Sequence, residues 1–308
     1  MRTLTALTLC SLSVLGVTAA QAQPTDWSKI ETKVEKVAGS VYMLSGVGGF
    51  AGGNVGVSVG EDGIVIVDDQ FEPMAPKIEA ALRGITTKPV RFVLNTHFHG
   101  DHTNGNKVFG RVATIVAHDN VRTRMAADDR FDDQPGTKAP PHALPLVTFD
   151  QRVSLHVNGE EVRGLHFPAG HTDGDTIVFF ARSNVVHMGD DFFNGMFPFV
   201  DLEGGGSVKG YLAAIEGALR QMPSDARIIP GHGPLASKAD LQGYLAMLTE
   251  TTSIVEKGLA QGRTADQLKS GKVLAAYDTK WGGGFIKTDT WIETIVSSLK
   301  GVAKNPGS

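Results

Sequence analysis

The stretch Thr96-His97-Phe98-His99-Gly100-Asp101-His102 places three imidazoles and one carboxylate side by side in the chain. Neutral imidazole and carboxylate oxygen both bind divalent zinc well, so the residue types suit that metal. His97 and His99 share one face of an extended segment, whereas Asp101 and His102 can turn toward a second point. A helical zinc motif would instead place its histidines one helical turn apart. The stretch therefore predicts half of a two-metal site at the end of a strand.

Three later fragments offer further ligands, each after a short apolar run. They are Gly170-His171-Thr172, Gly189-Asp190 and Pro230-Gly231-His232. Glycine beside each ligand lets the backbone come close to an ion. Asp191 is an alternative to Asp190. In enzymes built on a β-sheet, the catalytic residues usually lie on loops that converge on one edge of the sheet.

The ordered motifs HxHxDH, GHT, GD and PGHG, which run from His97 to His232, resemble the signature of the metallo-β-lactamase superfamily. This resemblance implies an α+β fold, a four-layer αββα sandwich, with two Zn²⁺ per chain held between the sheets. By position it implies a first zinc on His97, His99 and His171. It implies a second zinc on Asp101, His102 and His232, with Asp190 bridging the two metals.

Two zinc ions about 3.5–4 Å apart can share a water and lower its pKa from about 16 toward about 7, which supplies hydroxide at neutral pH. One ion polarises the scissile carbonyl and the other stabilises the developing charge. Asp101 is the predicted catalytic residue, because it can orient that hydroxide. Asp68 or Asp69, at the end of an apolar strand, is expected to accept a hydrogen bond from a ligand imidazole, and His187 is a further candidate for such a supporting role.

Two segments are candidates for the wall of a substrate cleft. The glycine-rich loop 47–53 carries Phe50 and is either a hairpin over the metals or a plain turn. The aromatic run 192–199 follows Asp190, and it predicts Phe193 and Phe197 as pocket residues. Core packing is the alternative for such a run.

The first residues read as a secretory signal peptide over 1–22. A positive start is followed by the apolar run 4–17 and by Ala20-Gln21-Ala22, a typical cleavage site. That run is too short to span a bilayer, so no membrane insertion is expected. The remaining residues, 23–308, suffice for a single metallo-β-lactamase-like domain. We therefore expect an exported protein, periplasmic or secreted.

The cysteine content and the net charge limit the possible metal ligands and partners. Cys10 is the only cysteine and lies in the predicted signal peptide, so the mature chain has no thiolate ligand. This excludes the lactamase subclasses that use a cysteine on the second zinc. The net charge of −4 gives no reason to expect nucleic acid as a partner.

Periodicity predicts the helices of the second half. Apolar residues align over 209–222, Ser237 and Asp240 form a predicted capping box, and Thr288 is expected to cap a last helix. Strands followed by helices, twice over, suit the αββα arrangement.

The leading interpretation is an exported zinc hydrolase that acts on a small molecule, with β-lactam hydrolysis, and hence antibiotic resistance, as the first choice. An aspartate at the bridging position is typical of glyoxalase II and the quorum-signal lactonases, so a lactonase or thioesterase is the alternative. A non-catalytic exported metal-binding protein is the remote alternative. The sequence leaves the oligomeric state open.

Overall fold

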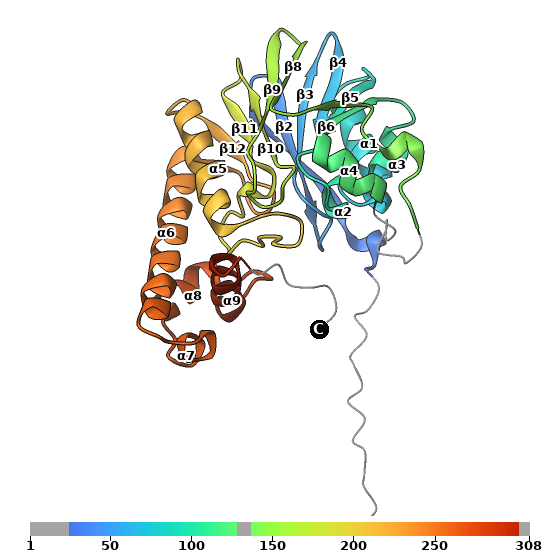
Figure 1. Ribbon diagram of the computed structural model, residues 1–308. Helices are drawn as coiled ribbons and strands as arrows, with labels where there is room; N and C mark the ends of the chain where they lie inside the picture. The colour runs from blue at the N-terminus through green and yellow to red at the C-terminus, as the bar shows by residue number, and fades with distance from the viewer. Residues whose placement is uncertain (1–24, 128–136, 302–308) are drawn as a thin grey trace, which may run out of the picture.

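Two β-sheets packed face to face form the centre of the molecule, and helices cover the outer face of each sheet (Figure 1). The computed structural model describes residues 25–127 and 137–301, so the predicted signal peptide lies outside the described residues. This architecture is the predicted four-layer αββα sandwich.

The first sheet contains seven strands in their order along the chain. They are β1 (Glu31–Ala38), β2 (Val41–Val47), β3 (Val55–Gly60), β4 (Gly63–Val67), β5 (Val90–Leu94), β6 (Thr114–His118) and β7 (Val147–Phe149). Strands β1 to β4 are antiparallel, whereas β4 to β7 run parallel. Parallel strands end at the same edge of a sheet, so the segments that follow β4 and β5 lie close together.

The second sheet contains six strands. They are β8 (Arg152–Val157), β9 (Glu160–His166), β10 (Thr176–Phe180), β11 (Val185–His187), β12 (Arg227–Ile229) and β13 (Ala236–Ser237). Their order in the sheet is β13-β12-β11-β10-β9-β8. Only the pair β11 and β12 is parallel among these described strands. The segments that follow β11 and β12 therefore also meet at one edge.

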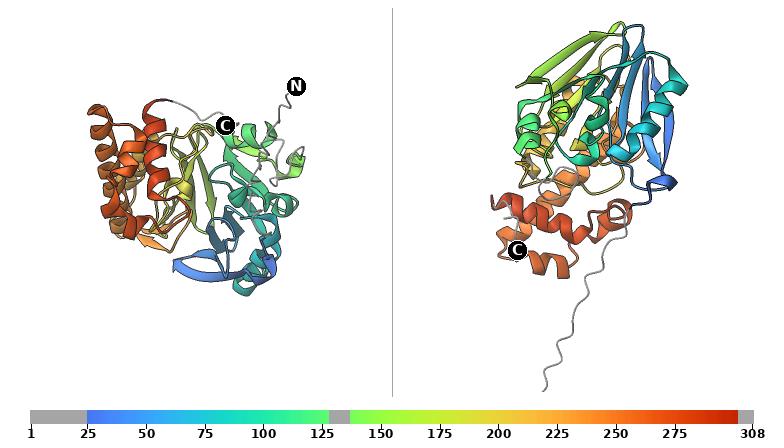
Figure 2. Two further views of the ribbon diagram at one scale, coloured as in Figure 1. Left: turned by 90° about the horizontal axis from the view of Figure 1, so that it is seen from below. Right: turned by 90° about the vertical axis from the view of Figure 1, so that its right-hand side faces the viewer.

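The described residues contain nine α-helices, most of which form the two outer layers (Figure 2). They are α1 (Ala75–Ile85), α2 (Gly100–Thr103), α3 (Asn106–Phe109), α4 (Asp119–Ala127), α5 (Val208–Gln221), α6 (Lys238–Ala260), α7 (Ala265–Ser270), α8 (Ala275–Trp281) and α9 (Thr288–Leu299). Helix α1 packs on the first sheet, and α5, α6 and α9 pack on the second. None of the helices within the described ranges is long and apolar enough to cross a membrane.

Strand β10 shows how alternation builds the layers, because every one of its residues is buried. Ile177 and Phe179 face the helices of the second outer layer, whereas Val178 and Phe180 face the space between the sheets. Successive side chains of a strand point to opposite faces, so one strand contributes to two cores. Burial of each such side chain contributes about 1.5–3 kcal/mol.

The predicted helix ends are partly right. Ser237 and Asp240 form the predicted capping box of α6. The prediction for Thr288 is wrong, because α9 begins at Thr288 and its capping residue is Lys287, which makes no side-chain cap. The Thr288 hydroxyl donates a hydrogen bond to Asp278 instead. This contact joins α8 to α9, and it could not be read from the local pattern.

Candidate functional site

Seven predicted residues meet at the edge where the strands of the two sheets end. The structure has a bend at 96–98 in place of the predicted extended segment. Helix α2 begins at Gly100, so Asp101 and His102 turn away from His97 and His99. The other three residues follow strands β9, β11 and β12. The seven are His97, His99, Asp101, His102, His171, Asp190 and His232.

The donor atoms of these residues form two groups. The first cluster is His97, His99 and His171; in it, His99 Nδ1 lies 2.9 Å from His171 Nε2. The second cluster is Asp101, His102 and His232. Here the Nε2 atoms of the two histidines are 3.4 Å apart, and Asp101 Oδ2 is 3.3 Å from His232 Nε2. Nitrogen donors gathered in this way can surround a cation.

The two carboxylate oxygens of Asp190 face different clusters. Oδ2 lies 3.6 Å from His171 Nε2 and 3.9 Å from His97 Nε2. Oδ1 lies 3.1 Å from His102 Nε2 and 3.3 Å from His232 Nε2. Asp190, rather than its neighbour Asp191, therefore has the position of a bridge between the clusters.

The residues present fit a pair of divalent cations. Within the first cluster plus Asp190, and within the second cluster, one donor atom per residue lies within 4.8 Å of all the others. His97 Nε2 is buried and has no hydrogen-bond partner in the described part of the chain. A buried donor atom without a partner is costly unless something binds it. Imidazole nitrogens and carboxylate oxygens are ligands that suit zinc and similar ions.

The two clusters differ in their protonation when no metal is bound. Burial lowers the pKa of His171 to about 4, and burial also lowers that of His97 well below its usual value. For His232, burial acts in the same direction, but the carboxylates of Asp190 and Asp101 outweigh it and raise the pKa to about 9. Metal binding must therefore displace a proton from His232, whereas burial favours the neutral, metal-binding form of His97 and His171.

Asp68 supports the second cluster from behind. Its fully buried carboxylate accepts hydrogen bonds from the Thr96 backbone N–H at 2.7 Å and the Thr96 hydroxyl at 2.8 Å. Its Oδ2 also lies 2.8 Å from His102 Nδ1, which directs His102 Nε2 toward the cluster. Asp69 does not have this position, because neither of its carboxylate oxygens has a hydrogen-bond partner among the described residues.

A second supporting segment escaped the sequence analysis. Asp201 Oδ2 lies 2.9 Å from His99 Nε2, and the Phe199 carbonyl accepts a hydrogen bond from His171 Nδ1 at 2.9 Å. Asp201 is itself held by the Gly204 backbone N–H at 2.8 Å. This loop follows the aromatic run, and no motif marks it. Its role depends on a contact between residues far apart in the chain.

Replacement of Asp201 by alanine should weaken metal binding at the first cluster by about 10–100-fold, because His99 loses the acceptor that orients its ring. Metal affinity can be measured by competition with a chelating dye. Asp201→Asn keeps an acceptor oxygen and should give an intermediate affinity. Glu203→Gln, an exposed change in the same loop, is the matched control. Unchanged affinity in Asp201→Ala would remove Asp201 from the site.

Comparison with known proteins identifies the family. The metallo-beta-lactamase superfamily is matched over residues 48–232, which is more than half of the chain and contains both clusters. The chain belongs to this superfamily. Among the curated relatives, a linear primary-alkylsulfatase of a Pseudomonas strain is 24% identical to this chain. The aligned region covers 70% of this chain and 50% of the sulfatase. A type 2 metallo-beta-lactamase of Elizabethkingia meningoseptica is 21% identical over 71% of this chain and 86% of its own.

Solved structures share the metallo-beta-lactamase fold. A metallo-beta-lactamase from Pontibacter korlensis has a TM-score of 0.56 at 19% identity, with 71% of this chain and 99% of that chain covered. A double mutant of a sec-alkyl sulfatase has a TM-score of 0.66 at 15% identity, with 90% and 52% covered. The chain thus spans about half the length of its sulfatase relatives.

In this metallo-beta-lactamase fold, the glycine-rich loop between β2 and β3 lies directly against the metal motif. A Cβ atom at Gly53 would lie 2.1 Å from His102 Cε1, and one at Gly231 would lie 2.0 Å from Asp190 Oδ1. Glycine at these two positions therefore lets the loops close around the clusters. The loop is the predicted overhanging segment rather than a plain turn, and it carries Phe50 over the site.

A cavity of about 440 Å³, here called the central cavity, opens over both clusters. Asp101, Asp190, His99 and His232 reach it from below. Phenylalanine side chains form its walls, and two of them are more than half exposed, Phe50 at 55% and Phe285 at 57%. The four are Phe50, Phe71, Phe199 and Phe285. Large apolar side chains left in solvent around polar groups are typical of a ligand site.

Only one of the predicted pocket phenylalanines has the expected place, namely Phe50. Phe197 is fully buried and stacks on Trp291 in the core, so its assignment to the pocket is wrong. Phe193 is also fully buried, and it stacks against His232 at a centroid distance of 5.2 Å. It supports the imidazole but is not part of the cavity wall. Phe71 and Phe285 were missed, since neither lies near a motif.

His187 has a structural role instead of a supporting role at the metals. Its Nε2 donates to the Asn54 carbonyl at 2.9 Å, and its Nδ1 accepts from the Gly189 backbone N–H. Asn54 in turn donates to the carbonyls of Pro230 and Gly233, both at 2.9 Å. Asn54 therefore ties the start of β3 to the loop that carries His232, and no pattern in the sequence indicated it.

Proposed function

We propose that this chain is an exported dinuclear zinc hydrolase that opens an activated carbonyl, with a β-lactam as the first substrate to test. The observation that carries the proposal is the position of Asp190, whose two oxygens face separate clusters at the floor of an open cavity. The predicted signal peptide supports export, which would place the enzyme where such antibiotics arrive. The similarity to metallo-beta-lactamases supports the same substrate class.

The chain's own residues would divide the work as follows. Bound zinc would supply Lewis acidity and a more acidic water. Asp101 lies at the cavity floor, where its carboxylate can accept a hydrogen bond from that water and orient it. Burial raises the pKa of Asp101, but His102 and His232 outweigh it, so the net pKa is lowered and the side chain is ionised at neutral pH. The phenylalanine walls would bind apolar substrate atoms and exclude bulk water.

A substrate panel on the metal-loaded protein tests the proposal. We expect a carbapenem or a cephalosporin to be hydrolysed, and the activity to fall more than about 100-fold on chelation and to return with zinc. Asp101→Asn should lose turnover while it remains folded, whereas a mere metal-binding protein would show no turnover in either form. Activity that survives complete removal of the metal would contradict the mechanism.

One observation favours a second candidate, a lactonase or thioesterase. Among the residues that the structure describes, no lysine or arginine lines the central cavity. A β-lactam antibiotic carries a carboxylate beside its reactive ring, and such an anion is best bound by a cationic side chain. An acyl lactone or thioester has no such charge at its carbonyl. In the same panel, a kcat/KM for an acyl-homoserine lactone or an acyl thioester that exceeds the β-lactam values by orders of magnitude would establish this alternative.

A further inference from the structure

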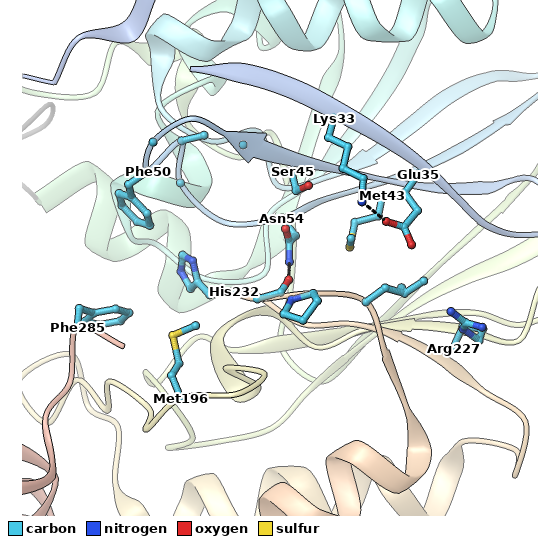
Figure 3. A pocket seen from close by; sticks show the side chains of 17 residues that line it. Lys33, Glu35, Met43, Ser45, Phe50, Asn54, Met196, Arg227, His232 and Phe285 are labelled. Carbon is cyan, nitrogen blue, oxygen red and sulfur yellow. Dashed lines mark hydrogen bonds and ion pairs between the residues drawn. The ribbon is translucent and has the colours of Figure 1, made fainter. Parts of the chain in front are cut away.

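A second cavity of about 530 Å³, here called the side cavity, continues from the central cavity. The two share three lining residues, Phe50, His232 and Phe285. Figure 3 shows these three at one end of the side cavity and Arg227 at the opposite end. Strands β1 and β2 form one side, and β12 with the segment before β13 forms the other. The central and side cavities are therefore one cleft.

The chemistry of the side cavity changes along its length. Met196 lines it beside the shared end, and Met43, which pairs with Glu35 across β1 and β2, lines it toward the far end; Leu235 is a further apolar lining residue. Flexible methionine side chains adapt to varied apolar ligands. The cations lie at the far end, where β1 contributes Lys33 and β12 contributes Arg227.

The two cations are not equally available. Lys33 Nζ already forms an ion pair with Glu35 Oε2 at 2.7 Å. The side chain of Arg227 makes no hydrogen bond or ion pair within residues 25–127 and 137–301, and the residue is exposed. A guanidinium presents a planar fork of donors that matches a carboxylate. Within the described ranges, the cleft thus has no lysine or arginine over the clusters and has an available cation at its distant end.

From this arrangement we propose that the cleft binds an elongated substrate. Its scissile carbonyl lies over the two clusters, its apolar arm runs along the side cavity, and an acidic group at the end of that arm binds Arg227. The inference rests on the second candidate of the proposed function, the lactonase or thioesterase, and names its substrate class: a long-chain acyl compound with a terminal acid. Arg227 and His232 are five residues apart along the chain, so their Cα atoms are separated by at most about 17 Å.

Hydroxamic acids test this proposal without turnover. The hydroxamate group binds metal, and the affinity contributed by the alkyl chain of the probe measures binding in the side cavity. The probes are suberic monohydroxamic acid, which ends in a carboxylate, and octanoyl hydroxamic acid, which ends in a methyl group, with their shorter and longer homologues. Binding to the zinc-loaded protein is measured by calorimetry. We expect the acid-ended probe to bind about tenfold more tightly, with an optimum chain length.

Arg227→Gln should abolish this preference and leave the affinity for the methyl-ended probe unchanged. Arg220→Gln, an exposed arginine on α5 that lies outside both cavities, is the matched control and should keep the preference. If both probes bind equally to the wild type, the proposed arm is wrong while the metal-hydrolase proposal stands. If neither hydroxamate binds, the metal centre itself fails, and this inference fails with it.

Discussion

Replacement of Asp190 by asparagine should lower kcat/KM by about 10³-fold or more and leave the folded protein with less bound metal. The side chain faces both clusters, with Oδ1 at 3.1 Å from His102 Nε2 and Oδ2 at 3.6 Å from His171 Nε2. Asparagine keeps the shape but lacks the charge, and its amide nitrogen cannot serve as a ligand. One change therefore affects both metals.

The same change should also alter the metal-free protein. Burial lowers the pKa of His232, but the carboxylates of Asp190 and Asp101 raise it to about 9. Without the Asp190 charge this pKa should fall, which an NMR titration of the histidine ring protons can measure. Metal content per chain gives the second readout. Asp225→Asn, an exposed aspartate before β12, should leave both unchanged. Full metal content in Asp190→Asn would show that Asp190 is not a bridge.

Replacement of Asp68 by alanine should reduce the free energy of unfolding by about 3–5 kcal/mol, because it leaves buried donors unpaired. The Thr96 backbone N–H and hydroxyl both donate to this carboxylate, and His102 Nδ1 lies 2.8 Å from it. The orientation of His102 then depends on the metal alone, so affinity at the second cluster should fall by about 10–100-fold. Denaturant unfolding and metal competition measure the two effects separately.

Asp69 is the matched control for this experiment. It is the next residue and fully buried, yet its side-chain oxygens have no hydrogen-bond partner in the described ranges. Burial and the neighbouring Asp68 raise its pKa well above the usual value, which favours the neutral acid. Asp69→Asn keeps the size of a side chain whose oxygens make no hydrogen bond to His102, so metal affinity should not change. Equal losses in Asp68→Ala and Asp69→Asn would mean that burial, not the hydrogen bonds, explains the result.

The contrast between Asp68 and Asp69 shows where sequence reasoning stops. Both follow the apolar strand β4 directly, and nothing in the sequence distinguishes them, so either could have faced the metals. Asp68 has a φ of +62°, which turns its carboxylate toward Thr96 and His102. A positive φ is uncommon for a residue other than glycine, and no local residue pattern indicated it here.

The cavity wall shows the same limit. The aromatic run predicted Phe193 and Phe197 as pocket residues, yet both are buried, whereas Phe199 from the same run reaches the cavity. Phe71 and Phe285 come from segments that no motif marks. In an irregular segment the direction of a side chain follows no period, so composition indicates an aromatic surface without showing which rings form it.

The order of the four motifs, through the resemblance to the metallo-β-lactamase superfamily, predicted the ligand set and the layered fold. Histidine, aspartate and glycine in four ordered motifs have little use except at a metal, and alternation of apolar residues decides which faces are buried. Only the tertiary structure decided that Asp190 and not Asp191 faces both clusters, that Asp201 supports His99, and that the cleft extends to Arg227. Each of these is a contact between residues distant in the chain, and its geometry depends on how the two sheets pack.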